Sequence, residues 1–154
     1  MSNGVELRRA TDADAEAAAG VFITSRRIAL PTVPFAHSDD EVRGYVRNVL
    51  IAKTEGWVAT DDGRVIAIMS LTPGWVDQLY VAPDRLGEGI GRQLLDLAKE
   101  RSEGALQLWT FQVNDRARRF YERNGFAVAE LTDGSVNEER TPDVRYVWRR
   151  PAET

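Results

Sequence analysis

The sequence predicts an α/β protein of the α+β kind, in which a mixed β-sheet carries helices on both faces. Segments with the two-residue period of strands and segments with the 3.6-residue period of helices alternate in the order β-α-α-β-β-β-α-β-α-β-β. Three consecutive strands are joined by short turns, which is typical of antiparallel hairpins. Strand–helix–strand units follow, and such units add parallel pairs to a sheet.

The N-terminal part is predicted to form one strand and two helices. Residues 5–9 are the strand, and Thr11 then offers an N-cap to an Ala-rich helix that ends near Arg27. Residues 30–37 contain two prolines and cannot continue as regular helix. Residues 38–41 fit a capping box, which predicts the start of a second helix. Apolar residues recur behind it at helical spacing, namely Val42, Tyr45, Val46, Val49 and Leu50.

The central part is predicted to be a run of antiparallel strands followed by a helix. Residues 57–60 and 65–71 flank a turn that contains Asp62-Gly63, and a second turn leads into a strand over residues 75–81. A glycine loop precedes a helix from about Gly89 to Ser102. Five apolar residues of this helix should face the core, namely Ile90, Leu94, Leu95, Leu97 and Ala98.

The C-terminal part is predicted to add three strands and one helix. A strand over residues 105–111 is followed by a helix over residues 115–124, with Gly125 as the residue just past its end. Two strands, 126–131 and 144–148, complete the pattern.

Length and composition restrict the function classes. A chain of 154 residues predicts one domain over residues 1–154. The net charge of −4 argues against broad nucleic-acid binding, which depends on neutralising phosphates. The absence of Cys, together with a single His, excludes disulfides, a catalytic thiol and a structural zinc site, so no metal is expected. Residues 1–10 carry no apolar leader and no stretch is long enough to span a membrane, so we expect a soluble, cytoplasmic protein.

The glycine loop Gly87-x-Gly89-x-Gly91 is the strongest chemical signal. It lies between a strand and a helix, where backbone N–H groups and the helix dipole favour a phosphate. The alternative is that the glycines only make a tight turn. A P-loop would need Lys and Ser or Thr after the last glycine, where Arg92 and Gln93 stand. A dinucleotide fold would place the loop after the first strand rather than the fourth.

Two segments resemble the GCN5-related N-acetyltransferase (GNAT) family. Leu79-Tyr-Val-Ala-Pro83 followed by Gly87-Glu-Gly-Ile-Gly-Arg-Gln-Leu-Leu95 looks like the acetyl-CoA signature of that family. Asn114-Asp-Arg-Ala-Arg-Arg-Phe-Tyr-Glu-Arg-Asn-Gly-Phe126 is similar to its second motif, in the family's order. Together the motifs cover about residues 75–126. The resemblance implies a GNAT-like fold, with a mixed, mostly antiparallel sheet of about seven strands flanked by about four helices.

The resemblance also implies acetyl-CoA as the cosubstrate and assigns residues to it. Amides from Gly87 to Arg92 would hold the pyrophosphate, and the backbone of residues 79–81 would pair with the pantetheine arm. The expected cofactor-binding residues are Leu79, Tyr80, Val81, Gly87, Glu88, Gly89, Ile90, Gly91, Arg92, Asn114, Ala117 and Tyr121. The chain departs from the family at Leu86, where Gln or Arg is usual, and at Glu88, where basic residues are frequent.

Acyl transfer to an amine needs a base, a donor to the oxyanion and an acid for the departing thiolate. Tyr121 is the candidate acid, because a phenol stays protonated at neutral pH; the alternative is a core aromatic residue. A backbone N–H near Leu79 or Val81 is expected to serve the oxyanion. Asp77 is a candidate base on the same strand face as Leu79; the alternatives are that it is a structural acceptor and that the proton leaves through ordered water. Asn114 is expected to cap its helix, contact the pantetheine arm, or do both.

The acceptor site is less defined by the sequence. His37, the only His, follows the Pro-containing segment that the family often uses for the acceptor, and a structural or exposed role is the alternative. Arginines at 116, 118, 119 and 123 form a basic helix face that is either solvated or attracts CoA phosphates. Residues 133–139 read as a loop whose carboxylates offer contacts to a cationic acceptor.

The expected function is therefore N-acetylation of a primary amine on a small molecule by direct attack in a ternary complex. The alternatives are acetylation of a protein N-terminus or lysine, and a CoA-binding regulatory module without catalysis. Neither nucleic acid nor membrane is expected as a partner, and a homodimer is expected by resemblance only. The identity of the acceptor amine is not encoded in any motif.

Overall fold

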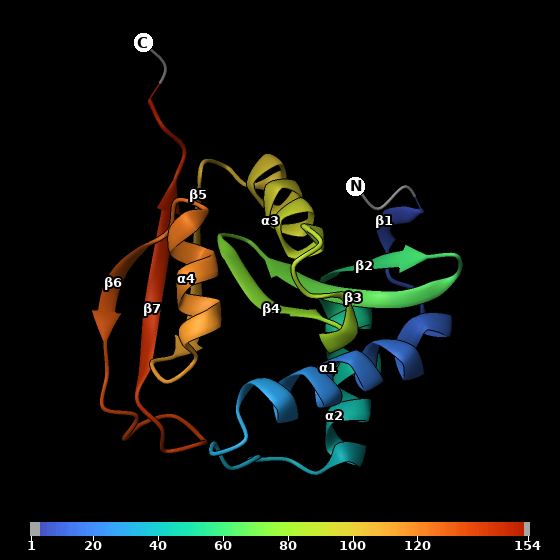
Figure 1. Ribbon diagram of the computed structural model, residues 1–154, viewed down its shortest axis with the longest axis horizontal. Helices are drawn as coiled ribbons and strands as arrows, with labels where there is room; N and C mark the ends of the chain where they lie inside the picture. Colours follow the sequence, from blue (N-terminus) through green and yellow to red (C-terminus); the bar gives the residue numbers. More distant parts are fainter. Residues whose placement is uncertain (1–3, 153–154) are drawn as a thin grey trace.

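The alternating strand and helix patterns fold into a seven-stranded sheet with helices on both faces, within the described residues 4–152 of the computed structural model (Figure 1). The strand order is β1-β2-β3-β4-β5-β7-β6. The elements are β1 (Val5–Arg9), α1 (Ala15–Ala29), α2 (Asp39–Tyr45), β2 (Glu55–Asp61), β3 (Arg64–Thr72), β4 (Trp75–Val81), α3 (Ile90–Arg101), β5 (Ala105–Phe111), α4 (Asp115–Arg123), β6 (Ala127–Leu131) and β7 (Asp143–Arg149).

Each face of the sheet carries its own hydrophobic core. Met69 and Leu71 of β3 belong to the core beneath α3 and α4, whereas Ile68, which directly precedes Met69, belongs to the core beneath α1 and α2. The alternation follows from the pleat of a strand, which sends successive side chains to opposite faces. The predicted fold class and order of elements are therefore confirmed. No helix within residues 4–152 is both long and apolar enough to cross a membrane.

The first helix begins later and ends later than its sequence pattern indicates. Thr11 caps a short 3₁₀ turn, Asp12–Asp14, and α1 runs from Ala15 to Ala29 rather than to Arg27. The carboxylate of Asp14 accepts the backbone N–H of Thr11 at 2.8 Å, which completes a capping box around this turn. The 3₁₀ turn is one common way to satisfy the first amides of a helix.

The second helix starts at the predicted capping box and then changes its winding. Ser38 Oγ accepts the N–H of Glu41 at 3.1 Å, and the Glu41 carboxylate accepts the N–H of Ser38 at 2.9 Å. After α2 the chain continues as a π-helix over Val46–Ile51, which the apolar spacing does not show. The wider winding turns Val49 partly outward, whereas Val46 and Leu50 stay buried.

The sheet consists of two antiparallel parts that meet between β4 and β5. β1 to β4 pair antiparallel in sequence order, and β5 pairs with β7, which pairs with β6. β4 and β5 are parallel and share a single register pair, Trp75 with Gln107. Beyond this pair the two strands separate, so the sheet opens toward the C-terminal end of β4.

Candidate active site

A cleft of about 900 Å³ lies where β4 separates from β5. Its walls come from α1, β4, the glycine loop with the start of α3, β5 and α4. Most of the residues that the sequence assigned to a cofactor line this cleft: Leu79, Tyr80, Val81, Gly87, Gly89, Ile90, Gly91, Arg92, Asn114, Ala117 and Tyr121. Segments separated by some forty residues in the sequence therefore share one hollow.

The glycine loop presents free backbone amides to the cleft. Gly87 and Gly89 have φ values of 80° and 83°, a left-handed conformation that glycine adopts without steric cost. Gly89 is the N-cap of α3, no side chain caps this end, and the first turn contains no acidic residue. The first α-helical bond runs from the N–H of Gln93 to the carbonyl of Gly89 at 3.1 Å, so the preceding amides have no helical acceptor.

Helices α3 and α4 approach each other closely beside this loop. A Cβ atom on Gly91 would lie 3.2 Å from Cζ of Phe120 and 3.6 Å from Cγ2 of Val81. The third glycine therefore serves the packing of α3 against α4 and β4, while the first two shape the loop. Asn114 fixes the start of α4, because its Oδ1 accepts the N–H of Ala117 at 3.2 Å.

Tyr121 is a buried aromatic residue that also lines the cleft. Its ring packs edge-on against Phe120 and Phe126, with centroid distances of 5.2 and 5.7 Å, and near Tyr146 at 6.1 Å. Burial raises the pKa of Tyr121 above its usual value, and the nearby Tyr80 adds to the rise. The two alternatives from the sequence are thus compatible, since the ring belongs to the core and the residue still reaches the cleft.

The candidate base Asp77 lines the cleft at an exposed position. Its carboxylate accepts the hydroxyl of Thr72 at 2.7 Å. An assignment of Asp77 as a strong base would need a buried carboxylate, and this one is exposed.

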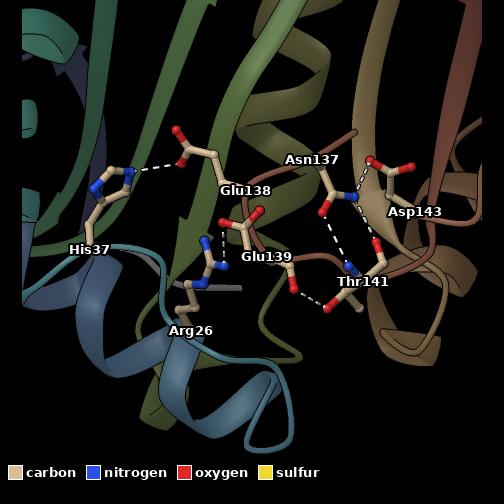
Figure 2. Close-up of polar contacts among 7 residues, drawn as sticks. All are labelled: Arg26, His37, Asn137, Glu138, Glu139, Thr141 and Asp143. Atoms are coloured by element: carbon tan, nitrogen blue, oxygen red, sulfur yellow. Dashed lines mark hydrogen bonds and ion pairs between the residues drawn. The ribbon is translucent and has the colours of Figure 1, made fainter. Parts of the chain in front are cut away.

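His37 lies in a different hollow, of about 470 Å³, formed with the loop between β6 and β7. Its Nε2 lies 2.7 Å from a carboxylate oxygen of Glu138 (Figure 2). Its Nδ1 lies 3.4 Å from a carboxylate oxygen of Glu41. The Glu138 carboxylate, followed by that of Glu41, raises the pKa of His37. The structure therefore does not bring His37 into the cleft with Tyr121.

Comparison with known proteins assigns the chain to a family. A family model described as an acetyltransferase (GNAT) domain matches residues 52–128. An uncharacterized N-acetyltransferase of Archaeoglobus fulgidus is 31% identical over 133 residues, which cover 76% of this chain and 89% of that protein. The chain belongs to the GNAT family of N-acetyltransferases. As a GNAT member it is an acyltransferase.

Two further comparisons bear on ligands of similar GNAT proteins. A peptidyl-lysine N-acetyltransferase of Escherichia coli, YiaC, is 30% identical over 86 residues, which cover 55% of this chain and 58% of that protein. The PaiA N-acetyltransferase of Thermoplasma acidophilum, solved in complex with coenzyme A, has the same fold with a TM-score of 0.72 at 21% identity. That comparison covers 94% of this chain and 98% of the other.

Leu86 and Glu88, the two residues that depart from the GNAT pattern, lie at the edge of the cleft and outside its lining, respectively. Leu86 is 41% exposed at the rim of the cleft. The carboxylate of Glu88 accepts a hydrogen bond from Nε of Arg85 at 3.0 Å. The carboxylate of Asp61 accepts one from Nη2 of the same arginine at 2.7 Å. The charge of Glu88 is thus paired with Arg85, and Glu88 is not among the residues that line the cleft.

The structure adds cleft residues that the sequence motifs do not indicate. Ser25 donates its hydroxyl to the carbonyl of Val81 at 2.9 Å, which ties α1 to the end of β4. Arg26 and Phe111 line the cleft from α1 and β5. Of the basic face on α4, Arg116 and Arg123 line the cleft, whereas Arg118 donates to the hydroxyl of Tyr146 at 3.0 Å. A basic residue in the last turn of a helix is common for electrostatic reasons, so Arg26 carries no distinctive signal in the sequence.

Proposed function

We propose that this GNAT protein transfers the acetyl group of acetyl-CoA to the primary amine of a small molecule, by direct attack in a ternary complex. The observation that carries the proposal is the cleft between β4 and β5. It joins the free amides at the start of α3 with the buried phenol of Tyr121. Family membership and the coenzyme A complex of a protein with the same fold support acetyl-CoA as the donor.

The residues around the cleft fit the chemistry of coenzyme A. Amides at an uncapped helix N-terminus match a pyrophosphate, since they supply N–H donors and partial positive charge. Beyond Trp75, β4 pairs with β3 only, so its edge toward the cleft is open to the amides of an extended ligand. The carbonyl of Val81 is partly engaged by Ser25, which leaves Leu79 and Tyr80 as the main pairing segment.

Tyr121 acts in this proposal as the general acid. Burial keeps its phenol protonated across the neutral range, so a proton is available when the sulfur of CoA departs. Asp77 is the carboxylate of β4 that lines the same cleft, and in this proposal it accepts the proton of the amine through water at the exposed rim. The acetyl group moves from sulfur to nitrogen, and one proton leaves the amine while another reaches the sulfur.

Contacts of the β6–β7 loop favour a small acceptor. Glu139 of this loop pairs with Arg26 of α1, and Glu138 bonds to His37 of the segment between α1 and α2 (Figure 2). The loop is thereby tied to α1 and to the segment after it, beside Arg26 of the cleft wall, and in this proposal it closes the acceptor side against a polypeptide. Lysine acetylation is the second candidate, favoured by the similarity to the peptidyl-lysine enzyme YiaC.

The proposal is tested by calorimetric titration with acetyl-CoA and by turnover with panels of amines and of lysine peptides. We expect Tyr121→Phe to bind acetyl-CoA as the wild type does and to lose about 10²-fold or more in kcat. The matched control is Tyr146→Phe, which removes a hydroxyl from the same aromatic cluster outside the cleft and should keep kcat.

Three results would contradict parts of the proposal. If the protein did not bind acetyl-CoA at millimolar concentration, acetyl-CoA would be ruled out as the donor of the acetyl group. Binding without turnover of any amine would favour a CoA-binding module. Turnover of lysine peptides in preference to small amines would show that the acceptor is a peptidyl lysine, while the proposed acetyl transfer from acetyl-CoA would stand.

A further inference from the structure

Arg26 is a nearly buried cation on the wall of the proposed active site. Its side chain is 14% exposed and belongs to the last turn of α1. The guanidinium lies over two aromatic rings, 5.1 Å from the centre of Phe35 and 5.5 Å from that of Phe111. Aromatic faces attract a guanidinium, yet they accept no conventional hydrogen bonds from it. The donors of this side chain therefore depend on the few polar groups nearby.

The protein satisfies only part of the hydrogen-bonding capacity of this guanidinium. The side-chain acceptor closest to it among residues 4–152 is Glu139 Oε2, which lies 3.2 Å from Nη2, and the Tyr80 hydroxyl is a second polar group that interacts with the guanidinium. Nε is shielded from solvent without any acceptor, and it is the one buried side-chain nitrogen or oxygen without a partner in the described part of the chain. A guanidinium offers five N–H donors, so these two neighbours leave part of its capacity unused.

The position of Glu139 is fixed by its own loop. The hydroxyl of Thr141 donates to the carbonyl of Glu139 at 2.9 Å (Figure 2). The Asn137 amide donates to the carbonyl of Thr141 at 2.7 Å and to Asp143 at 3.1 Å. Its oxygen accepts the N–H of Thr141 at 3.2 Å. Because this loop is internally braced, Glu139 holds Nη2 in place and leaves the rest of the guanidinium oriented in advance.

Tyr80 of β4 shares the cleft with Arg26 and Tyr121. It is partly buried, and its ring lies 4.5 Å from that of Phe22, which precedes Arg26 by one turn on α1. Desolvation raises the pKa of Tyr80, whereas the charge of Arg26 and a hydrogen bond with its side chain lower it. Arg26 thus lines the cleft from the α1 wall, beside Tyr80, and Tyr121 lines it from the α4 wall.

Resting on the proposed function, we propose that the acceptor is a primary amine that also carries a carboxylate, as an amino acid does, and that Arg26 binds this carboxylate. Arg26 supplies N–H donors from the cleft wall beyond the one that Glu139 engages, and the amine of the acceptor points along Tyr80 toward Tyr121. Charge also favours an acceptor of this kind, because its carboxylate would carry a charge opposite to that of the nearby guanidinium.

The first test compares acceptors and needs no variant. Turnover with acetyl-CoA is measured for a set of amino acids, their carboxamides and the corresponding amines without the carboxyl group. We expect kcat/KM for the best amino acid to exceed that of its carboxamide by about 10- to 100-fold, the usual worth of a hydrogen bond to a charged group. Equal turnover of the three kinds of acceptor would overturn the proposal.

The second test changes the residue. Arg26→Gln should lower kcat/KM for the amino acid by about 10- to 100-fold and change that for the carboxamide little, and Arg26→Lys should lie between. The matched control is Arg27→Gln, since Arg27 is exposed, pairs with Asp39 at 2.7 Å and does not line the cleft. An equal loss for both acceptors in Arg26→Gln would reveal a role in holding the loop and would overturn the proposal.

A third measurement separates this inference from the proposed function. Binding of the N-acetylated amino acid is measured by calorimetry, with and without CoA, in the wild type and in Arg26→Gln. We expect weaker binding in the variant, with acetyl-CoA affinity unchanged. Failure of the wild type to bind acetyl-CoA would contradict the proposed function, whatever the binding of the N-acetyl amino acid. Equal binding of the N-acetyl amino acid by both proteins would overturn the role of Arg26.

Discussion

At the scale of single residues, His37 shows how position changes the meaning of a chemically versatile side chain. It is the only His of the chain, and its Nε2 lies 2.7 Å from Glu138, outside the cleft that contains Tyr121. It therefore connects the segment after α1 with the β6–β7 loop. Since that loop also supplies Glu139 to Arg26, the contact of His37 supports the loop that pairs with the proposed acceptor residue.

We predict that the pKa of His37 lies above its ordinary value of about 6.5. The stability that this contact adds is present below the ordinary pKa and lost as the pH rises through the raised value. An NMR titration reads the value directly, because the chain has one imidazole. Glu138→Gln should lower the pKa more than the matched Glu41→Gln. A wild-type pKa at or below 6.5 would contradict the contact.

At the scale of elements, backbone conformation separates glycines that look alike in the sequence. Gly20 lies in the middle of α1, and a Cβ atom there would meet nothing within 4 Å. Gly89 also has open space around it, but its φ of 83° is one that L-residues rarely adopt. The first position tolerates a side chain and the second does not, although neither is crowded.

We predict opposite effects of one substitution at these two positions. Gly20→Ala should raise the free energy of unfolding by about 0.5–1 kcal/mol, because alanine loses less conformational entropy in a helix. Gly89→Ala should lower it by about 1–2 kcal/mol, because its backbone must stay left-handed. Urea unfolding of both variants measures the difference. A loss of stability in Gly20→Ala would show that α1 is packed more closely there than the structure indicates.

At the scale of the whole molecule, polar contacts tie the first strand to the helix layer. Asp14 precedes α1 and accepts two hydrogen bonds from Arg8 of β1, at 2.8 and 2.9 Å. It also accepts the N–H of Thr11 at 2.8 Å. The Arg8 guanidinium, followed by the Thr11 amide, holds the pKa of this buried carboxyl at about 2. One carboxylate thus joins an edge strand of the sheet to the helix that carries Arg26.

We predict that Asp14→Asn lowers the free energy of unfolding by about 1–2 kcal/mol at pH 7. A depressed pKa gives stability that is present above the unfolded value of about 3.9 and is lost as the pH falls toward 2. The difference from the wild type, measured by urea unfolding, should therefore shrink below pH 4. Asp12→Asn is the control, since Asp12 is exposed. A difference independent of pH would contradict the ion pair.

Local signals in the sequence determined the fold class, most elements and the two motifs. The turn at Asp62-Gly63, the capping box at Ser38 and the loop at Gly87 depend on residues close in the chain, and all three were predicted. Periodicity also placed most of the core. It missed the π-helix after α2, because both kinds of winding bury Val46 and Leu50.

Only the tertiary structure decided which of these residues meet. The separation of β4 from β5 after one register pair opens the cleft, and no single segment encodes it. The same packing leaves Asp77 exposed and takes His37 into another hollow. It also brings Arg26 to Glu139 across 113 positions of the chain. Periodicity and turn chemistry act between near neighbours, whereas the contacts of a buried charge depend on how all the elements pack.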